Sequence, residues 1–390
     1  MKPKLLWVTD EVPDPELGGG SIRQYELLTR ISDSAEIDLL LVGSLRNRDL
    51  RQALRAVHEV PPFQGPIRPA LVRRLSDVRD VALLRTPMEL RWARRTRELL
   101  DRHLGDTSSY SLVQVEHEWF APLLPAQKRN RWAITLHNLI SVRARQGAAV
   151  AHKRRVRWLL EGDADNAARL ERWISRSYDV TIAVSDADAA GLERAVVVPN
   201  GVDLDRFNAE PIPSAPRLLF SGSFNYEPNV DAALWFCGEI LPLVRHEVPM
   251  ATVAIVGRQP DHRMRRLAAQ RGVDTHFDVP SIRPYLSSAR VVVVPVRIGS
   301  GTRLKALEAM AACRPVVGTP VGLEGLGLQQ GVSAEIAADA EGVASGIVRL
   351  LTDDTYAEQL ARAGRRLVED RFSWDRIAKI YLEGVLTPFT

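Results

Sequence analysis

Short apolar runs alternate with amphipathic stretches along most of the chain. In the first half, runs typical of buried strands, rich in leucine and β-branched residues, cover residues 4–9, 37–42, 112–116, 132–136, 180–184 and 195–198. Between them, Arg, Glu and Leu recur three and four residues apart, as at residues 21–31, which is the period of a helix with one buried face. Strands that alternate with helices predict a parallel sheet covered on both faces.

Turn-forming residues interrupt this pattern in the middle of the chain. The sequence Pro-Asn-Gly-Val-Asp at residues 199–203 is followed by Pro211, Pro213 and Pro216. Glycine and proline at this density mark a connection between domains. We therefore predict one domain over residues 1–200, a linker over residues 201–216 and a second domain over residues 217–374.

The alternation restarts beyond this break. Strands are expected at residues 217–221, 252–256, 290–294 and 315–317, and helices at residues 229–243, 264–269 and 303–312. Both halves are thus predicted to be doubly wound α/β domains. Ligands bind beyond the carboxyl ends of the strands in such sheets, so we expect two Rossmann-like domains that face a central cleft.

Composition narrows the class of protein. The 390 residues are 45% hydrophobic and 26% charged, as in ordinary globular proteins. The longest apolar runs are far shorter than the roughly 20 residues that a membrane-spanning helix needs. The two cysteines cannot form a disulfide framework or a zinc cage, and the first residues do not resemble a signal peptide. We therefore expect a cytoplasmic protein.

Positive charge is concentrated in two regions, although the net charge is only +4. Between Arg46 and Arg102 there are 14 arginines against 7 carboxylates, and a second cluster at residues 153–157 lies beside Trp158. Two interpretations stay open: a solvated helix face, or peripheral contact with anionic lipid at the inner face of a membrane. Nucleic acid is not expected as a partner, because the basic regions lack interleaved aromatic residues and no nucleic-acid-binding motif is present.

Three glycines, Gly18, Gly19 and Gly20, follow the first predicted strand and precede the first helix. Glycines at this place let a phosphate approach the N–H groups of a helix N-terminus. The spacing differs from the dinucleotide fingerprint, because Arg23 stands where the third glycine would be. A nicotinamide dehydrogenase is therefore disfavoured, and a simple flexible turn is the alternative to a phosphate site.

The most informative stretch is residues 297–310, Arg-Ile-Gly-Ser-Gly-Thr-Arg-Leu-Lys-Ala-Leu-Glu-Ala-Met. It follows a buried strand and opens a helix, so residues 299–302 are predicted to form a phosphate-sized nest at the helix N-terminus. Lys305 or Arg303 is interpreted as a cation for a diphosphate, and Glu308 as an acceptor for ribose hydroxyls. A surface ion pair between Lys305 and Glu308 is the plainer alternative.

This stretch and several others resemble the GT-B glycosyltransferases of the large group 1, or family 4, retaining class. The resemblance rests on residues 299–310, 314–317, 199–203 with Phe207, 220–229, 135–138 and the glycines at 18–20. It implies an enzyme that transfers a sugar from a nucleoside diphosphate sugar to a hydroxyl of a saccharide, lipid-linked glycan or secondary metabolite. It also implies retention of configuration, no metal or other cofactor, and a final helix at residues 375–390 that packs back on the first domain.

Roles in binding the donor follow from this resemblance. The second domain is implied to hold the donor through Gly222, Ser223, Arg258, Ile282, Gly301, Thr302, Arg303, Leu304, Lys305 and Glu308. The first domain is implied to contribute Gly19 and Gly20 to donor binding. Ser300 stands where the family has the first glutamate of its E-x7-E motif. Ser223 and either Pro228 or Asn229 stand where many members have the Arg and Lys that bind the diphosphate. We therefore expect Arg303 or Lys305, with Arg258, to neutralise the leaving diphosphate.

The first domain is implied to contribute His137, which follows a strand and is expected to contact the hydroxyls of the transferred sugar. His137, Lys305 and Arg303 are the predicted catalytic residues, with His137 positioning the substrate and stabilising charge. Glu116, His117 and Glu118 are predicted to orient an acceptor, or to be surface charges at a strand end. The two Asp-Ala-Asp sequences at residues 163–165 and 186–188 lie in helical contexts, so no divalent metal is predicted.

Two other functions remain open at this stage. A sugar-nucleotide 2-epimerase shares the expected two-domain architecture. A non-catalytic protein that binds nucleotide sugars is the second alternative, because Ser300 replaces the family glutamate.

Overall fold

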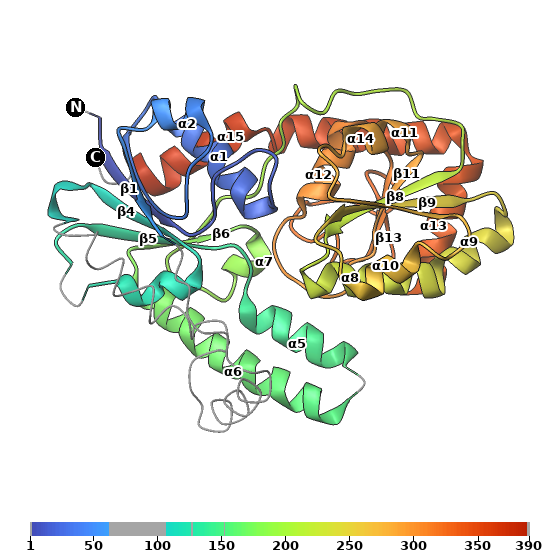
Figure 1. Cartoon of the computed structure of the whole chain (residues 1–390), viewed down its shortest axis with the longest axis horizontal. Coiled ribbons are helices and arrows are strands. Elements are labelled where there is room, and N and C mark those ends of the chain that lie inside the picture. The colour runs from blue at the N-terminus through green and yellow to red at the C-terminus, as the bar shows by residue number, and fades with distance from the viewer. Residues whose placement is uncertain (1, 62–106, 126–127, 152, 388–390) are drawn as a thin grey trace. The chain divides into compact units, whose positions relative to one another are not determined.

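The structure is a computed structural model that describes residues 2–61, 107–125, 128–151 and 153–387. The chain divides into two compact units. Unit 1 comprises Met1–Pro199 and Ile377–Thr390, and unit 2 comprises Asn200–Arg376. Each unit contains a parallel sheet with helices on both of its faces (Figure 1). The predicted fold of two doubly wound α/β domains is therefore confirmed.

The sheet of unit 1 has seven parallel strands in the order β3-β2-β1-β4-β5-β6-β7. The strands are β1 (Lys4–Thr9), β2 (Glu36–Val42), β3 (Ala56–Val60), β4 (Leu112–Glu116), β5 (Arg131–Leu136), β6 (Val180–Ala183) and β7 (Ala195–Val197). The strand order reverses between β1 and β4, so the segments that follow these two strands start at one edge of the sheet, on either side of the switch point.

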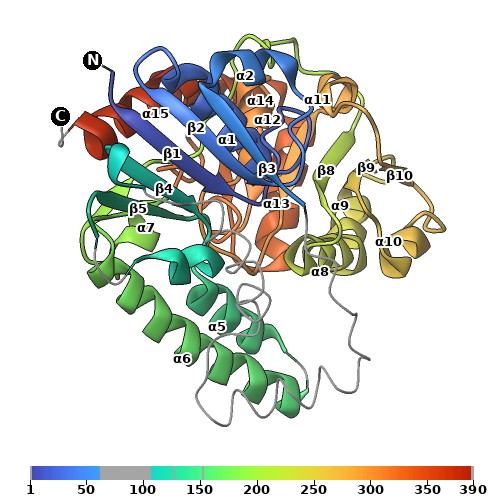
Figure 2. The ribbon, with the colours of Figure 1, turned by 60° about the vertical axis from the view of Figure 1, so that its left-hand side comes forward.

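The helices of unit 1 are short except for one antiparallel pair. They are α1 (Gly19–Ile31), α2 (Arg48–Ala53), the 3-10 turns η2 (Thr107–Ser109) and η3 (Glu118–Leu123), α5 (Ile140–Val150), α6 (Arg154–Ser177) and α7 (Asp186–Ala189). Helices α5 and α6 lie side by side and extend beyond the sheet (Figures 1 and 2). No helix among the described residues has the length and apolar character needed to cross a bilayer.

The C-terminal segment from Ile377 onward belongs to unit 1. Helix α15 (Trp374–Tyr381) is followed by the π-helical turn η5 (Leu382–Leu386). The ring of Tyr381 lies 5.9 Å from that of Trp7 in β1, and its hydroxyl donates a hydrogen bond of 3.3 Å to Gln114 Oε1 in β4. The end of the chain is thus anchored on the two strands that flank the switch point.

The sheet of unit 2 has six parallel strands in the order β10-β9-β8-β11-β12-β13. The strands are β8 (Arg217–Ser223), β9 (Thr252–Arg258), β10 (Val273–Phe277), β11 (Val291–Val294), β12 (Val316–Gly318) and β13 (Glu335–Ile336). The helices are α8 (Glu227–Trp235), α9 (Leu241–Glu247), α10 (His262–Leu267), α11 (Arg283–Ser288), α12 (Leu304–Ala311), α13 (Ala340–Thr352) and α14 (Asp354–Arg371). Here the order reverses between β8 and β11.

The segment at residues 201–216 packs on unit 2. Val202 N donates a hydrogen bond of 2.8 Å to Phe372 O, and Phe207 is buried in the hydrophobic core of that unit. Gly201 lies so close to the Trp374 ring that a Cβ would be 2.7 Å from its Cδ2 atom. This segment is therefore held by the same core as the sheet.

The sequence pattern overlooks three strands and one helical irregularity. Strands β3, β10 and β13 lie at or next to sheet edges and carry polar residues, so they lack the apolar runs that mark central strands. The helix expected at residues 229–243 continues from α8 through the π-helical segment η4 (Phe236–Ile240) into α9. Pro242 lies in the first turn of α9, where a missing N–H costs little.

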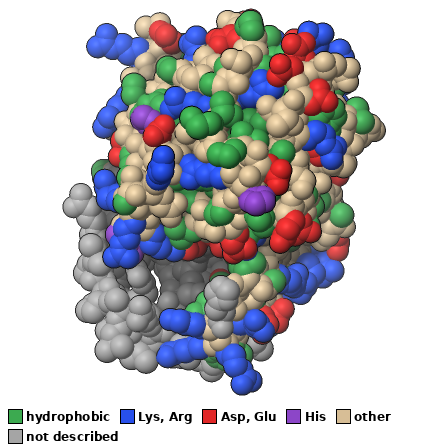
Figure 3. Space-filling view, turned by 90° about the vertical axis from the view of Figure 1, so that its right-hand side faces the viewer, with side chains coloured by type: hydrophobic (Ala, Val, Ile, Leu, Met, Phe, Trp, Pro, Cys, Tyr) green, Lys and Arg blue, Asp and Glu red, His purple; other side chains and the backbone are tan. Residues whose placement is uncertain are grey.

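The surface of unit 2 mixes charges of both signs. Figure 3 shows acidic and basic side chains interspersed over the face it presents, with apolar side chains scattered among them. Interspersed charges of this kind produce no extended field of one sign on that face.

Candidate active site

The loop between β11 and α12 forms the candidate phosphate nest in unit 2. Gly299 and Gly301 have φ angles of 133° and 80°, which glycine adopts without the steric cost that a side chain would add. Asn200 ties the loop down, because its N and Nδ2 atoms donate to Thr302 Oγ1 and Thr302 O, each at 3.1 Å. Helix α12 begins at Leu304, and its first N–H groups have no acceptor within the helix.

Lys305 connects this helix to the end of β8. Its Nζ donates a hydrogen bond of 2.8 Å to Asn229 Oδ1 and lies 4.6 Å from the centre of the Phe220 ring. Asn229 Nδ2 in turn donates to Ser223 O at 2.9 Å. Burial, helped by the neighbouring Arg303 charge, lowers the pKa of Lys305 to about 7, while Glu308 acts in the opposite direction.

The ends of β8 and β9 approach each other at two glycines. A Cβ on Gly257 would lie 1.8 Å from Gly222 O, and a Cβ on Gly222 would lie 2.8 Å from Asn229 Cγ. Ser223 and Arg258 are paired in register at the same ends. The structure thus brings Gly222, Ser223 and Lys305 together around Asn229, a residue to which the sequence reading gave no role of its own.

Arg303 takes a different position from Lys305. Its Nη1 donates to Ser300 O at 2.6 Å, and a Cβ on Gly299 would lie 2.6 Å from its Nη2. The Arg303 guanidinium therefore contacts the loop that precedes α12, and Ser300 in this loop is buried. Glu308 is partly buried one helical turn beyond Lys305, whereas Ile282 precedes α11 and packs on the hydrophobic core.

In unit 1, His137 and Glu116 form a buried pair at the ends of β5 and β4. His137 Nε2 lies 2.6 Å from Glu116 Oε2. The other oxygen, Oε1, accepts hydrogen bonds from Thr135 Oγ1 at 3.0 Å and Gln114 Nε2 at 3.1 Å. Three hydrogen bonds satisfy the carboxylate, which is why it can be ionised although its side chain is only 1% exposed.

The pKa directions in this pair agree on one protonation state. Burial and the nearby His117 charge lower the pKa of His137, outweighing the raising effect of Glu116. Burial raises the pKa of Glu116, but the hydrogen bond from His137 and nearby charges lower it below its usual value. A neutral His137 therefore donates its Nε2 proton to an ionised Glu116. Its Nδ1 is left as an acceptor and makes no hydrogen bond within the described chain.

His117 has the opposite charge state. Its ring stacks on Trp119 at 4.1 Å and lies 4.3 Å from the His137 ring, and its Nε2 is 3.5 Å from Glu11 Oε2. Burial lowers the pKa of His117, but Glu11 and the nearby charges of Asp10 and Glu118 outweigh it and raise the pKa to about 9. His117 also has a φ of 74°, a backbone strain that is typical of functional sites.

Glu11, which follows β1, completes this cluster. Burial raises its pKa, yet the nearby charge of His117, with which it forms an ion pair, lowers it to about 2. The carboxylate lies against Gly20, where a Cβ would be 1.7 Å from Glu11 Oε2. The side chain of Glu11 thus occupies space at the glycine turn that the sequence assigned to the donor, and the role of Gly19 and Gly20 in binding the donor stays a prediction.

Four residues of unit 1 were missed from the sequence. Glu11 and Asp10 directly follow β1, so the rule that sites lie beyond strand ends could have identified them. Arg23 and Gln114 lie within a helix and a strand, where no local signal marks them. Arg23 is buried and donates to Val198 O at 2.8 Å and Pro199 O at 2.7 Å.

The acidic and basic segments singled out in the sequence lie away from these contacts or outside the described residues. Asp163 and Asp165 lie in α6, and the second Asp-Ala-Asp sequence opens α7, where Ser185 Oγ accepts from Asp188 N at 3.1 Å. Among the described residues, no group of three His, Cys, Asp or Glu side chains is placed to hold a metal. Most of the arginine-rich region between Arg46 and Arg102 lies outside the described residues, whereas residues 153–158 are all exposed.

Two family models match consecutive parts of the chain. Glycosyltransferase Family 4 matches residues 17–206, and Glycosyl transferases group 1 matches residues 215–353. The chain belongs to this family of glycosyltransferases. The predicted family is therefore confirmed.

Curated relatives of this glycosyltransferase are similar along part of their length. A glycogen synthase of Mycobacterium tuberculosis is 30% identical over 54% of this chain and 54% of its own length. A D-inositol 3-phosphate glycosyltransferase of Frankia alni is 29% identical over 75% of this chain and 77% of its own. This chain thus spans about half the length of the matched glycogen synthases.

Solved structures resemble the glycosyltransferase over nearly all of its length. The sucrose-phosphate synthase of Thermosynechococcus elongatus has a TM-score of 0.71 at 19% identity, covering 97% of both chains. Anabaena HepE, solved with UDP and glucose, has a TM-score of 0.65 at 15% identity, covering 98% of this chain and 99% of its own. At these identities the likeness shows the fold, which is GT-B.

Proposed function

We propose that this glycosyltransferase transfers a sugar from a nucleoside diphosphate sugar to an acceptor hydroxyl, with retention of configuration and without a metal. The observation that carries the proposal is Lys305. The resemblance expects a diphosphate-binding lysine near Pro228 or Asn229, and this chain supplies a lysine from α12 whose Nζ lies 2.8 Å from Asn229 Oδ1. The sequence has no lysine at Pro228 or Asn229, and α12 provides one from a different part of the chain.

The donor is proposed to bind unit 2 at the Lys305–Asn229 pair and the glycine nest. The N–H groups at the start of α12 and the Lys305 ammonium suit the oxygens of a diphosphate. Glu308, one turn further along α12, suits ribose hydroxyls as an acceptor. The fold neighbours include HepE, solved with UDP and glucose, which is consistent with such a donor.

The charge state of unit 1 suits a sugar undergoing transfer. The free Nδ1 of neutral His137 is proposed to accept a hydrogen bond from a sugar hydroxyl. Protonated His117, whose ring lies 4.3 Å from that of His137, is proposed to keep His137 neutral by repulsion between like charges. Glu116, His117 and Glu118 were expected to orient an acceptor. Because Glu116 is saturated by three hydrogen bonds, its proposed role is to hold His137 in one tautomer and orientation.

Retention is proposed to follow a front-face route. The departing diphosphate takes the acceptor proton as the new glycosidic bond forms on the face from which it leaves. Lys305 stabilises the charge that develops on the diphosphate when the sugar–phosphate bond breaks. This route needs neither a covalent sugar–enzyme intermediate nor a metal.

A panel assay tests the reaction. The full chain is incubated with UDP-, GDP- and ADP-sugars and with candidate acceptors, and the products are identified by mass spectrometry and their anomeric configuration by NMR. Transfer with retention that persists in EDTA supports the proposal. An inverted product, or activity abolished by EDTA and restored by a divalent metal, contradicts it.

The same assay distinguishes the two alternatives. A 2-epimerised sugar nucleotide formed from donor alone identifies the epimerase, whereas slow hydrolysis of the donor fits a transferase. Calorimetric titration with UDP and GDP addresses a non-catalytic protein: binding of a nucleotide together with no turnover over the whole panel favours that alternative.

We also propose that the start of α6 docks on an anionic membrane. The exposed residues Lys153, Arg154, Arg155 and Arg157 lie beside the exposed Val156 and Trp158, whose side chain is 47% accessible. Basic residues next to an aromatic ring suit an interface of anionic headgroups, at about 1 kcal/mol per basic residue.

Vesicle binding tests this surface. At low salt, the protein is expected to co-sediment with phosphatidylglycerol vesicles but not with phosphatidylcholine vesicles. The double change Arg154→Gln and Arg155→Gln should weaken binding by roughly tenfold or more. The matched control, Arg265→Gln and Arg266→Gln on α10, should not. Equal binding by both double variants would overturn the assignment.

A further inference from the structure

A series of buried hydrogen bonds runs from the C-terminal segment of unit 1 to His137. Tyr381 in α15 donates to Gln114 Oε1 at 3.3 Å, and Gln114 Nε2 donates to Glu116 Oε1 at 3.1 Å. Glu116 Oε2 lies 2.6 Å from His137 Nε2. The side chains of Tyr381, Gln114 and Glu116 are buried, and all four residues belong to unit 1. These four residues form the Tyr381–His137 network.

The direction of each hydrogen bond in this network is fixed by chemistry. An ionised carboxylate can only accept, so the Gln114 amide must turn its Nε2 toward Glu116 and its Oε1 toward Tyr381. Burial, helped by the Glu116 charge, raises the pKa of Tyr381 well above its ordinary value, so its hydroxyl keeps its proton and donates. Gln114 Nε2 also donates to Thr135 Oγ1 at 2.8 Å, and that hydroxyl donates to Glu116 Oε1 at 3.0 Å. The donors are thus aligned from Tyr381 toward the carboxylate.

Packing does not require these polar groups. Gln114 lies in the middle of β4, between two buried valines, and is paired in register with Trp7 of β1 and Ala133 of β5. The Tyr381 ring lies 5.9 Å from that of Trp7, a contact that phenylalanine would make equally well. Apolar side chains of the same shape in place of buried polar partners are often neutral or stabilising. A role in placing Glu116 therefore accounts for the network better than a role in core stability.

We infer that Tyr381 and Gln114 are positioning residues, through which the C-terminal segment orients Glu116 and thereby His137. The Tyr381 hydroxyl polarises the Gln114 amide, which makes its N–H groups better donors to the carboxylate. A carboxylate held by donors on Oε1 keeps Oε2 directed at His137 Nε2 and leaves Nδ1 of the imidazole as the acceptor. The use of that Nδ1 in sugar transfer rests on the proposed function; the orientation of the imidazole does not.

Charged groups from three other segments face the Glu116–His137 pair. Burial raises the pKa of Glu116, but the hydrogen bond from His137 lowers it below its ordinary value, and the positive charges of Arg23 in α1 and His117 after β4 act in the same direction. Burial and the His117 charge lower the pKa of His137. The carboxylates of Glu116 and of Glu11, which follows β1, raise it by less. A substitution within the network that adds no charge leaves these fields in place, so a changed titration reports the lost hydrogen bond.

NMR of the full chain with labelled histidine and no ligand tests the orientation. The His137 signals are assigned by comparison with His137→Gln, and at neutral pH the unmodified protein is expected to carry the ring proton on Nε2. Gln114→Met keeps the length of the side chain but removes a donor to the carboxylate. The pH at which the Glu116–His137 pair takes up a proton should therefore rise by about one unit. Tyr381→Phe removes only the polarising hydroxyl, so it should cause a smaller shift in the same direction.

Tyr178→Phe is the matched control. Tyr178 is another fully buried tyrosine of unit 1, and its hydroxyl donates to Ala121 O at 3.1 Å. The substitution removes one hydroxyl and one hydrogen bond, as Tyr381→Phe does, and should leave the titration of His137 unchanged. An equal shift in both tyrosine variants overturns the inference. A neutral His137 with its proton on Nδ1 in the unmodified protein also overturns it, as does an unchanged titration in Gln114→Met or Tyr381→Phe.

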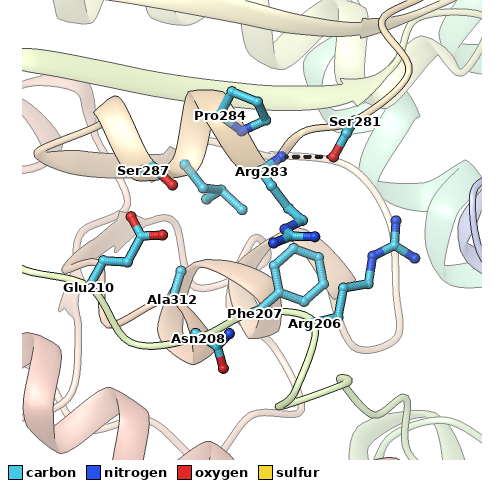
Figure 4. Close-up of a pocket in the computed structure, with 10 residues that line it drawn as sticks. Arg206, Phe207, Asn208, Glu210, Ser281, Arg283, Pro284, Ser287 and Ala312 are labelled. Carbon is cyan, nitrogen blue, oxygen red and sulfur yellow. Dashed lines mark hydrogen bonds between the residues drawn. The ribbon is translucent and has the colours of Figure 1, made fainter.

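A second control lies in unit 2. A cavity of about 310 Å³ opens there between residues 206–210 and α11 (Figure 4). Ser287 of α11 lines this cavity, and none of the four network residues does. Ser287→Ala removes a hydroxyl from the other unit and should change neither the His137 titration nor turnover.

Turnover tests whether the orientation of His137 matters for transfer. Gln114→Met is expected to lower kcat by roughly tenfold, the effect of one hydrogen bond to a charged group, and Tyr381→Phe by about threefold. The affinity for UDP, measured by calorimetry, should not change, because the proposed donor contacts lie in unit 2. A normal kcat in Gln114→Met, or an equal loss in Ser287→Ala, overturns the positioning role. If the unmodified protein transfers no sugar, the proposed function fails, while the histidine titrations still decide the network.

Discussion

Lys305 in α12 and Asn229 in α8 are 76 residues apart in sequence, and their side chains are joined by a hydrogen bond of 2.8 Å. The pair closes over Phe220, whose ring lies 4.6 Å from the Lys305 Nζ. A lysine held in this way keeps a low pKa in the free protein. A bound anion raises the pKa of the lysine, so anion binding is accompanied by proton uptake.

Replacing Lys305 with methionine should lower turnover and raise the free energy of unfolding. The variant Lys305→Met is expected to lose roughly a hundredfold in turnover, the usual effect of removing one stabiliser of developing charge. Its free energy of unfolding at pH 7 should rise by about 1 kcal/mol, because a partly buried ammonium is replaced by an apolar chain of similar length. Kinetics and chemical denaturation measure the two effects.

The control is Lys379→Met, which removes an exposed lysine on α15. It should change neither quantity. Normal turnover in Lys305→Met would contradict the proposed role of this lysine.

UDP affinity should depend on pH through the same residue. Burial lowers the pKa of Lys305 to about 7, so the ammonium is present below pH 7 and is lost as the pH rises above it. Affinity for UDP is therefore expected to fall between pH 7 and 9, and calorimetry at pH 7 in buffers of different ionisation enthalpy should show proton uptake on binding. In Lys305→Met both effects should be absent. A flat affinity profile in the unmodified protein would rule out the linkage.

Stability shows the opposite trend for this group. Its pKa of about 7 in the folded state lies below the ordinary value of 10.5, so the unfolded state binds more protons between these two values. The contribution of Lys305 to stability therefore rises with pH across that window. The stability advantage of Lys305→Met should accordingly shrink as the pH approaches 10.

Glu11 should control the charge of His117. The two side chains form an ion pair at 3.5 Å, and the pKa of His117 is raised to about 9. Glu11→Gln is expected to lower the His117 pKa by at least about one unit, measured by NMR titration of labelled histidine. The contribution of this pair to stability is present below pH 6.5 and is lost as the pH rises through 9.

Asp10→Asn provides the comparison for this experiment, since Asp10 acts on His117 less strongly than Glu11. It should produce a smaller decrease in the His117 pKa. A His117 that titrates at its ordinary value in the unmodified protein would refute the assigned charge state.

Gly257 should tolerate no side chain. A Cβ there would lie 1.8 Å from the backbone oxygen of Gly222, so β8 and β9 would have to separate beside the Lys305–Asn229 pair. Gly257→Ala is expected to cost about 2–3 kcal/mol of unfolding free energy and to weaken UDP binding. Gly238→Ala, whose Cβ would meet nothing within 4 Å, should leave both unchanged or slightly raise stability. Equal behaviour of the two variants would contradict the prediction.

Local patterns were sufficient for the central strands and for the loop that opens α12. Strand β1 is a largely apolar run because both of its faces are buried, so the sequence predicted its bounds. Strands β3 and β10 were missed because polar residues interrupt them at the sheet margins. The position of Arg303 in the sequence did not show where its side chain lies. Its guanidinium donates a hydrogen bond back to Ser300 O.

The sequence by itself determined the alternating α/β architecture and, through residues 297–310, the glycosyltransferase family. Both are properties of short segments, whose periodicity and residue types can be read locally. Only the tertiary structure decided that Lys305 meets Asn229, that Glu11 holds His117 protonated, and that Glu116 fixes the tautomer of His137. These contacts depend on which strand ends lie next to each other in the sheet. The charge states depend on the balance between burial and nearby charges in their effect on each pKa. Residues remote in sequence determine the contacts and the charge states, so no local pattern encodes them.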